Sequence, residues 1–97
     1  MTKNPREISK EEIEQKMTSL DGWKIKDTKK IYKEFSFKNF KQALDFTNKI
    51  GDVAEEMQHH PDIFLTWGEV KIEIYTHHTG NLTQSDFELA EKIDQIG

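Results

Sequence analysis

Apolar residues recur every three to four positions in three segments of this chain, a spacing that predicts helices with one face toward a core. The segments run from Ser9 to about Leu20, from Phe40 to about His59, and from Thr83 toward the C-terminal end. Their apolar stripes are Ile13, Met17 and Leu20; Phe40, Ala43, Leu44, Ile50, Val53, Ala54 and Met57; and Phe87, Ala90, Ile93 and Ile96. Each segment starts at a residue suited to capping, namely Ser9 with Glu12, Asn39, and Thr83 with Asp86.

Four shorter segments have the composition and alternation typical of strands. They are Trp23–Lys26, Ile31–Phe37, Asp62–Trp67 and Val70–His77. A polar turn joins the first pair, and Gly68-Glu69 is expected to join the second pair as a type II′ hairpin turn. The order α-β-β-α-β-β-α predicts an α+β fold, with a four-stranded antiparallel sheet covered on one face by three helices.

The composition narrows the class of protein. At 97 residues we expect one domain, 1–97, and the formal charge of −4 argues against direct nucleic-acid binding. No apolar run resembles a signal peptide or reaches the roughly 18 residues of a membrane span. The chain has no cysteine, which suits a cytoplasmic location. Eight of the 14 Lys and Arg residues lie between Lys24 and Lys49, which predicts either a solvated face or a docking patch for an anionic partner.

All four histidines occur in two adjacent pairs, His59-His60 and His77-His78, each at the end of a predicted element. Three interpretations are open: exposed polar residues, metal ligands, or acid–base groups that titrate near neutral pH. Metal binding is disfavoured because adjacent side chains project in different directions, whereas zinc ligands are usually spaced along one face. Glu55 precedes His59 by four residues, so the two share a helix face, either as an ordinary surface pair or with the carboxylate orienting that imidazole.

Taken together, these residues resemble the signature of the pterin-4a-carbinolamine dehydratase family. The matching pattern is Glu55-x3-His59-His60-Pro61-x5-Trp67-x9-His77-x8-Asp86. The segment from Gly80 to Ala90 and the Asp21-Gly22-Trp23 turn are also similar to the family. The resemblance implies the same fold and removal of water from 4a-hydroxytetrahydropterin to give quinonoid dihydropterin. In that reaction the pterin is the substrate, and no metal or other cofactor is required.

The resemblance also implies roles for individual residues. His59 and His77 would be the acid–base pair, His60 would position the pterin, and Glu55 would tune His59. The pocket would be lined by Gln58, His59, His60 and Pro61 from one segment, and by Tyr75, Thr76, His77 and His78 from the other. Trp67 and Asp86 would be structural, as a packed strand residue and a partner of the helix cap. The sequence departs from the family at Gln58, where animal members are acidic, and at Asn81, which replaces a glycine.

Two kinds of partner follow from the same resemblance. The first is a second copy of the chain, as a homodimer or homotetramer. The second is another protein, because relatives on this fold also serve as non-catalytic interaction modules, including a cofactor of transcription-factor dimerisation. The His59, His60 and His77 set favours the enzyme, since a pure scaffold need not keep it.

Overall fold

The computed structural model describes residues 8–27, 29–76 and 79–96, and in these ranges it confirms the predicted order of elements. The elements are α1 (Lys10–Thr18), β1 (Lys24–Lys26), β2 (Lys30–Ser36), α2 (Phe40–Met57), β3 (Asp62–Leu65), β4 (Glu69–Ile74) and α3 (Gln84–Ile96). The Ser9–Glu12 capping box at α1 is present, and Asn39 caps α2 by accepting from the Gln42 N–H at 2.9 Å. None of the helices in these ranges is long and apolar enough to cross a membrane.

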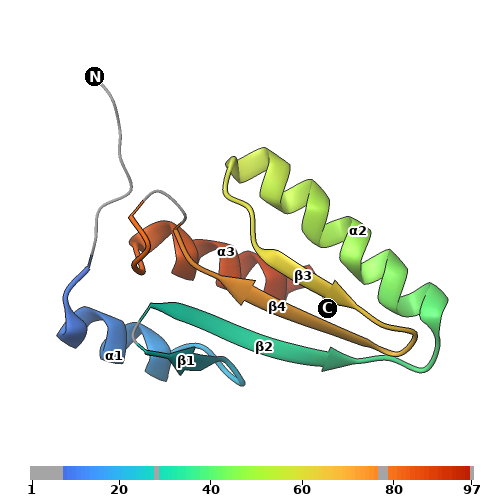
Figure 1. Ribbon diagram of the computed structural model, residues 1–97, viewed down its shortest axis with the longest axis horizontal. Coiled ribbons are helices and arrows are strands. Elements are labelled where there is room, and N and C mark those ends of the chain that lie inside the picture. Colours follow the sequence, from blue (N-terminus) through green and yellow to red (C-terminus); the bar gives the residue numbers. More distant parts are fainter. Residues whose placement is uncertain (1–7, 28, 77–78, 97) are drawn as a thin grey trace.

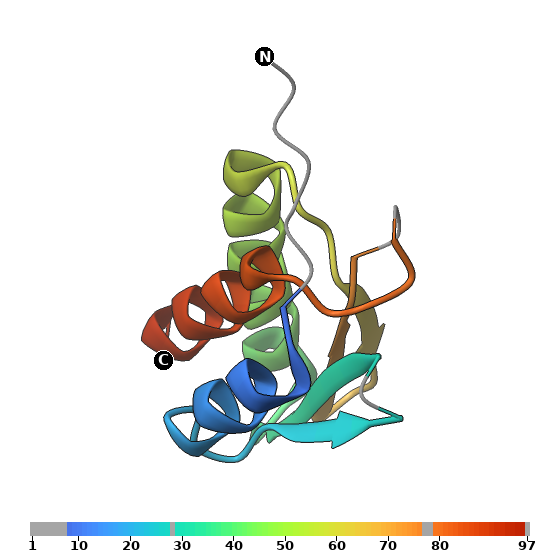
Figure 2. The ribbon, with the colours of Figure 1, turned by 90° about the vertical axis from the view of Figure 1, so that its left-hand side faces the viewer.

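The four strands form one antiparallel sheet in the order β1-β2-β4-β3. Figures 1 and 2 show all three helices on one face of this sheet, as predicted, with the other face uncovered. The ends of α2, β4 and the start of α3 meet at one end of the molecule (Figure 1). At this end His59 and Thr76 both contact Asp86.

The core lies between the sheet and the helices. In β4 the residues Val70, Ile72 and Ile74 are fully buried and alternate with Lys71 and Glu73, as the period of two predicts. The buried apolar cluster also includes Ile8, Ile13, Leu20, Trp23, Ile31, Ala43, Phe46, Ile50, Leu82, Phe87, Leu89, Ala90 and Ile93. Every helix therefore contributes its apolar stripe to a single core.

The buried face of α2 differs from the predicted apolar stripe. Phe40 and Leu44 were expected in the core but are 49% and 36% exposed. Phe46 is buried in their place, with its ring centroid 4.7 Å from that of Phe35 and 5.1 Å from that of Phe37. The rings of Phe35 in β2 and Phe37 just after it therefore determine which side of the helix is covered.

The β3–β4 hairpin differs from the prediction in its turn. The Thr66 N–H donates to the Glu69 carbonyl at 2.9 Å, so Trp67 and Gly68 are the central residues. Among the described residues, positive φ occurs only at Gly22, Asp27, Gln58 and Gly80, so the turn lacks the φ that type II′ requires at Gly68. Trp67, predicted as a packed strand residue, is 72% exposed at this turn.

A polar cluster fastens α3 to the first hairpin. The Trp23 indole N–H lies 3.0–3.1 Å from the two Asp94 carboxylate oxygens, and the Lys33 ammonium donates to Asp94 at 3.0 Å. The same ammonium donates to the Asp21 carbonyl at 2.8 Å and lies 4.9 Å from the centre of the Phe35 ring. Lys33 thus occupies a strand position on the helix-covered face because its charge is matched there.

Candidate functional site

The last turn of α2 aims two adjacent histidines in different directions. Gln58 ends the helix in the left-handed conformation, with φ 54°, and the His59 N–H reaches back to the Ala54 carbonyl at 3.1 Å. The helix was predicted to continue to about His59, and it ends at Met57 instead. After this turn the His59 side chain is 12% exposed and that of His60 is 50% exposed. One imidazole therefore faces the interior and the other faces solvent.

His59 is paired with a buried carboxylate. Its Nε2 lies 2.6 Å from Oδ1 of Asp86, whose side chain is completely buried at the start of α3. Because a carboxylate accepts and does not donate when ionised, this contact assigns a proton to Nε2 of His59. That leaves Nδ1 as the ring nitrogen able to exchange a proton with a ligand.

Glu55 does not orient His59, contrary to the prediction. Its carboxylate lies 2.5 Å from Nε2 of His60, five residues along, and this pair is exposed on the surface. The predicted spacing assumed a continuous helix, but the left-handed Gln58 turns the chain before His59. His59 and His60 therefore pair with different carboxylates, the buried Asp86 and the exposed Glu55.

Asp86 is held on its second oxygen by groups from two segments. Oδ2 accepts from the Thr83 N–H at 2.8 Å and from the Thr76 hydroxyl at 2.9 Å. The first contact is the carboxylate half of the predicted capping arrangement of α3. Asp86 is thus structural, as predicted, but it is also the direct partner of His59.

Of the remaining predicted residues, Thr76 contacts the same carboxylate. Thr76 is buried, Tyr75 and Pro61 are half-buried, and Gln58 is exposed. His77 and His78 lie outside the described residues. Thr76 therefore brings the β4 segment to Asp86, and through Asp86 to His59.

Charged residues of β2 and β4 lie next to Tyr75 on the uncovered face of the sheet. The Lys30 ammonium is 3.1 Å from Glu73 and 5.4 Å from the centre of the Tyr75 ring. The hydrogen bond to Glu73 raises the pKa of Lys30. Burial acts to raise the pKa of Glu73, but hydrogen bonds from Lys30 and Lys71 outweigh it and hold that pKa below its usual value.

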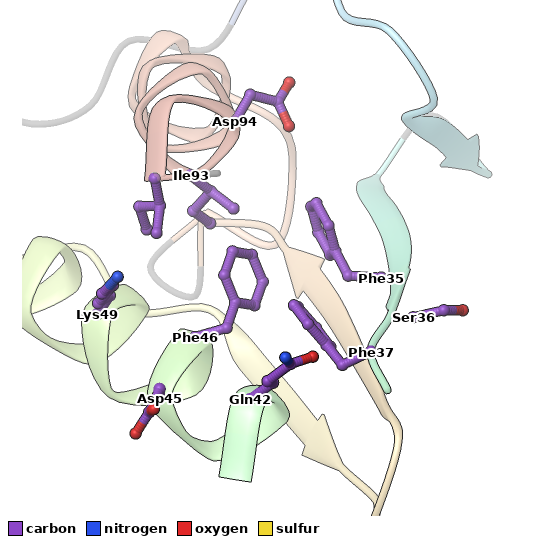
Figure 3. Close-up of a pocket in the computed structure, with 10 residues that line it drawn as sticks. Phe35, Ser36, Phe37, Gln42, Asp45, Phe46, Lys49, Ile93 and Asp94 are labelled. Atoms are coloured by element: carbon purple, nitrogen blue, oxygen red, sulfur yellow. The ribbon is translucent and has the colours of Figure 1, made fainter. Parts of the chain in front are cut away.

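A groove of about 400 Å³ lies at the opposite end of α2 and α3. Phe35 from β2, Phe37 just after it, Phe46 from α2 and Ile93 from α3 point toward one another in it (Figure 3). It contains none of the predicted site residues, and its two carboxylates already have partners: Asp94 in Trp23 and Lys33, and Asp45 in Lys41. The groove is therefore separate from the histidine region.

Within residues 8–27, 29–76 and 79–96, no three His, Cys, Asp or Glu side chains are grouped so as to hold a metal ion. The acid–base groups of the described region instead form the two separate pairs, His59–Asp86 and His60–Glu55.

Sequence reasoning missed the role of Asp86 toward His59. The two residues are 27 positions apart, and no local spacing indicates their contact. The one available signal was an acid at a predicted helix cap, which a structural role already explained. Long-range contacts of this kind emerge only when α2 and α3 are placed on the sheet.

The sequence as a whole matches a known family of proteins. The family model described as pterin 4 alpha carbinolamine dehydratase covers residues 6–96. This chain belongs to that family.

Two similar proteins carry the name of the same family. A protein from Rubrobacter xylanophilus with the provisional name pterin-4-alpha-carbinolamine dehydratase is 44% identical, over 89% of this chain and 80% of its own length. A protein of the same provisional name from Alkaliphilus metalliredigens is 45% identical, over 91% of this chain and 80% of its own.

Solved structures extend the comparison. A transcriptional coactivator/pterin dehydratase from Brucella melitensis has a TM-score of 0.88 at 28% identity, covering 94% of this chain and 98% of that one. A pterin dehydratase-like protein described as a RuBisCO assembly factor of the alpha-carboxysome has a TM-score of 0.66 at 19% identity, covering 77% and 88%. The second likeness concerns the fold alone.

Proposed function

We propose that this protein dehydrates 4a-hydroxytetrahydropterin to quinonoid dihydropterin, in the cytoplasm and as a step of tetrahydropterin recycling. The observation that carries the proposal is the 2.6 Å contact between Nε2 of His59 and the buried Asp86. It supplies an oriented imidazole at the position where the family signature places one. Membership of the family gives the substrate class.

The reaction moves two protons and breaks one bond. The C4a–O bond breaks, an acid protonates the departing hydroxyl so that water leaves, a base takes the proton from N5, and the C4a–N5 double bond forms. Neither a metal nor a redox cofactor enters this balance. Imidazoles suit both transfers because they bind and release protons near neutral pH.

We assign the two proton transfers to His59 and His77. His59 would act through Nδ1, since Asp86 occupies its Nε2. His60, oriented by Glu55 at the surface, would bind and position the pterin. The segments Gln58–Pro61 and Tyr75–His78 would line the pocket, which is consistent with the way Thr76 and His59 meet at Asp86.

The test is dehydration of 4a-hydroxytetrahydropterin generated in situ. We expect turnover by the wild type and a loss of ~10²- to 10⁴-fold in His59→Ala and His77→Ala. His60→Ala should mainly raise KM. Glu56→Ala, an exposed change on the same helix, is the matched control and should keep wild-type rates. A folded wild type that leaves the reaction at its background rate would refute the dehydratase.

A specific observation also supports self-association. β3 is an edge strand of the sheet, and Phe64 on it is 52% exposed, close along the chain to the exposed Trp67. Exposed apolar groups on a free edge favour contact with another chain. We propose a homodimer or homotetramer, tested by light scattering of the wild type and of Phe64→Lys. A wild type that is monomeric at about 100 µM would refute self-association. A partner of another kind would then be the remaining interpretation of these exposed side chains.

A further inference from the structure

Two buried threonine hydroxyls lie behind the Asp86 carboxylate. Thr76 is 3% exposed and Thr83 is fully buried, and with Asp86 they are the only buried polar residues in the described parts of the chain. Thr76 follows β4 and directly precedes His77, and Thr83 directly precedes α3. A cluster of three polar groups in an otherwise apolar core requires complete hydrogen bonding.

Each of the two threonine hydroxyls has one hydrogen to donate within this cluster. Thr76 has one hydroxyl hydrogen, and it is donated to Oδ2 of Asp86 at 2.9 Å. The Thr83 hydroxyl lies 2.7 Å from that of Thr76 and 3.5 Å from Oδ2, so it donates to Thr76. The donors therefore run in one direction, from Thr83 to Thr76 to Asp86. Only Oδ1 then remains for His59, at 2.6 Å.

We propose that Thr76 is a positioning residue for His59, with Thr83 as its support; this rests on the proposed function. The Thr76 hydroxyl holds the Asp86 carboxylate in the rotamer that presents Oδ1 to Nε2. The imidazole consequently keeps its proton on Nε2 and offers Nδ1 to the substrate. Because Thr76 adjoins His77 in the chain, one residue ties both halves of the site to a single carboxylate.

The hydroxyl can be removed without disturbing the surrounding backbone. The Thr76 carbonyl accepts from the Gly80 N–H at 2.8 Å and the Thr79 N–H at 3.2 Å, and these bonds do not involve the side chain. Thr76→Val has nearly the same shape but removes the shorter of the two hydroxyl contacts to Oδ2, leaving the Thr83 N–H at 2.8 Å and the Thr83 hydroxyl at 3.5 Å. Asp86 then loses its donor from the β4 segment, so its carboxylate is held less firmly and fixes the tautomer of His59 less strongly.

The experiment compares Thr76→Val with Thr76→Ser, which keeps the hydroxyl, and with Thr83→Val, which removes the second donor. We expect Thr76→Val to lower kcat by roughly 10- to 100-fold, as for a misplaced catalytic group, with little change in KM. Thr76→Ser should stay within about threefold of the wild type and Thr83→Val should lie between the two, because it is one bond further from the carboxylate. Melting temperatures establish that each variant is folded.

The imidazole ¹⁵N shifts of His59 give a readout independent of turnover. The wild type and Thr76→Ser should show the Nε2–H tautomer, and Thr76→Val a mixture. Should Thr76→Val fail to fold, Thr83→Val supplies the same comparison with a smaller displacement. Unchanged kcat and tautomer in Thr76→Val, or equal losses in Thr76→Ser, would overturn the proposal. A wild type without turnover would refute the dehydratase, and the ¹⁵N comparison would still decide the role of Thr76.

Discussion

Replacing Asp94 with alanine should destabilise the protein far more than its position on the surface of α3 suggests. Asp94 accepts hydrogen bonds from the Trp23 indole and the Lys33 ammonium, at 3.0–3.1 Å. The Asp94→Ala change leaves both donors without this acceptor. Hydrogen bonds to charged groups contribute ~1.5–3 kcal/mol when well shielded.

The magnitude must be reduced for solvent. The Asp94 and Lys33 side chains retain 27% and 20% exposure, so water compensates part of the loss. We take about 1 kcal/mol for the ion pair and about 1 kcal/mol for the indole bond, or ~2 kcal/mol in the free energy of unfolding. For a domain of this size that corresponds to a fall of roughly 8–16 °C in melting temperature.

The assay is urea unfolding followed by Trp fluorescence, with thermal melts alongside. Asp45→Ala is the matched control, because its carboxylate is 55% exposed and lies 3.9 Å from Lys41 in an i, i+4 surface pair worth ~0.3–0.5 kcal/mol. A double-mutant cycle with Lys33→Met should give a coupling energy near 1 kcal/mol. If Asp94→Ala and Asp45→Ala fall within about 0.5 kcal/mol of each other, the cluster contributes nothing beyond an ordinary surface pair.

Two further predictions concern charge and backbone. Since its flanking lysines hold the pKa of Glu73 below the usual value of 4.5, the ionised carboxylate stabilises the fold above that pH. This contribution is lost as pH falls through the lowered pKa. The urea midpoints of wild type and Glu73→Gln, measured from pH 7 to pH 3, should therefore converge at the acid end. A constant difference between the two midpoints would contradict this effect of Glu73. Gly22 has φ +83°, and an added Cβ would lie 3.0 Å from Cε of Lys33, so Gly22→Ala should lower the free energy of unfolding by ~1–2 kcal/mol. Gly51 lies within a helix with open space around it, so Gly51→Ala should raise that free energy by ~0.5–1 kcal/mol in the same melts. A neutral Gly22→Ala would show that the turn can relax.

Local chemistry made most of the fold predictable. The alternation of Val70, Ile72 and Ile74 gave the buried face of β4, and Ser9 and Asn39 marked two helix starts. These signals act between near neighbours, where side-chain direction follows directly from the backbone period. The order of elements and the single covered face of the sheet followed from them.

The wrong predictions concern features that depend on a segment far away in the sequence. A period of 3.6 locates an apolar stripe, but only the rings of Phe35 and Phe37 determine that Phe46 is covered and Leu44 is not. At the site, the pairing of Glu55 changed because one left-handed residue ended α2 earlier than Pro61 implied. Neither effect has a signal within a short window of sequence.

The contact between His59 and Asp86 has a consequence for how the protein is made. The histidine emerges from the ribosome 27 residues before its partner, and α3 is also fastened through contacts that span 61 and 71 positions. Contacts of such separation close large loops and tend to form late in folding. A nascent chain that has completed the sheet carries His59 and His60 but not Asp86, the carboxylate that orients His59. The oriented His59 that the proposed activity requires is therefore formed only when the final helix docks, so we expect a chain truncated before α3 to lack that activity.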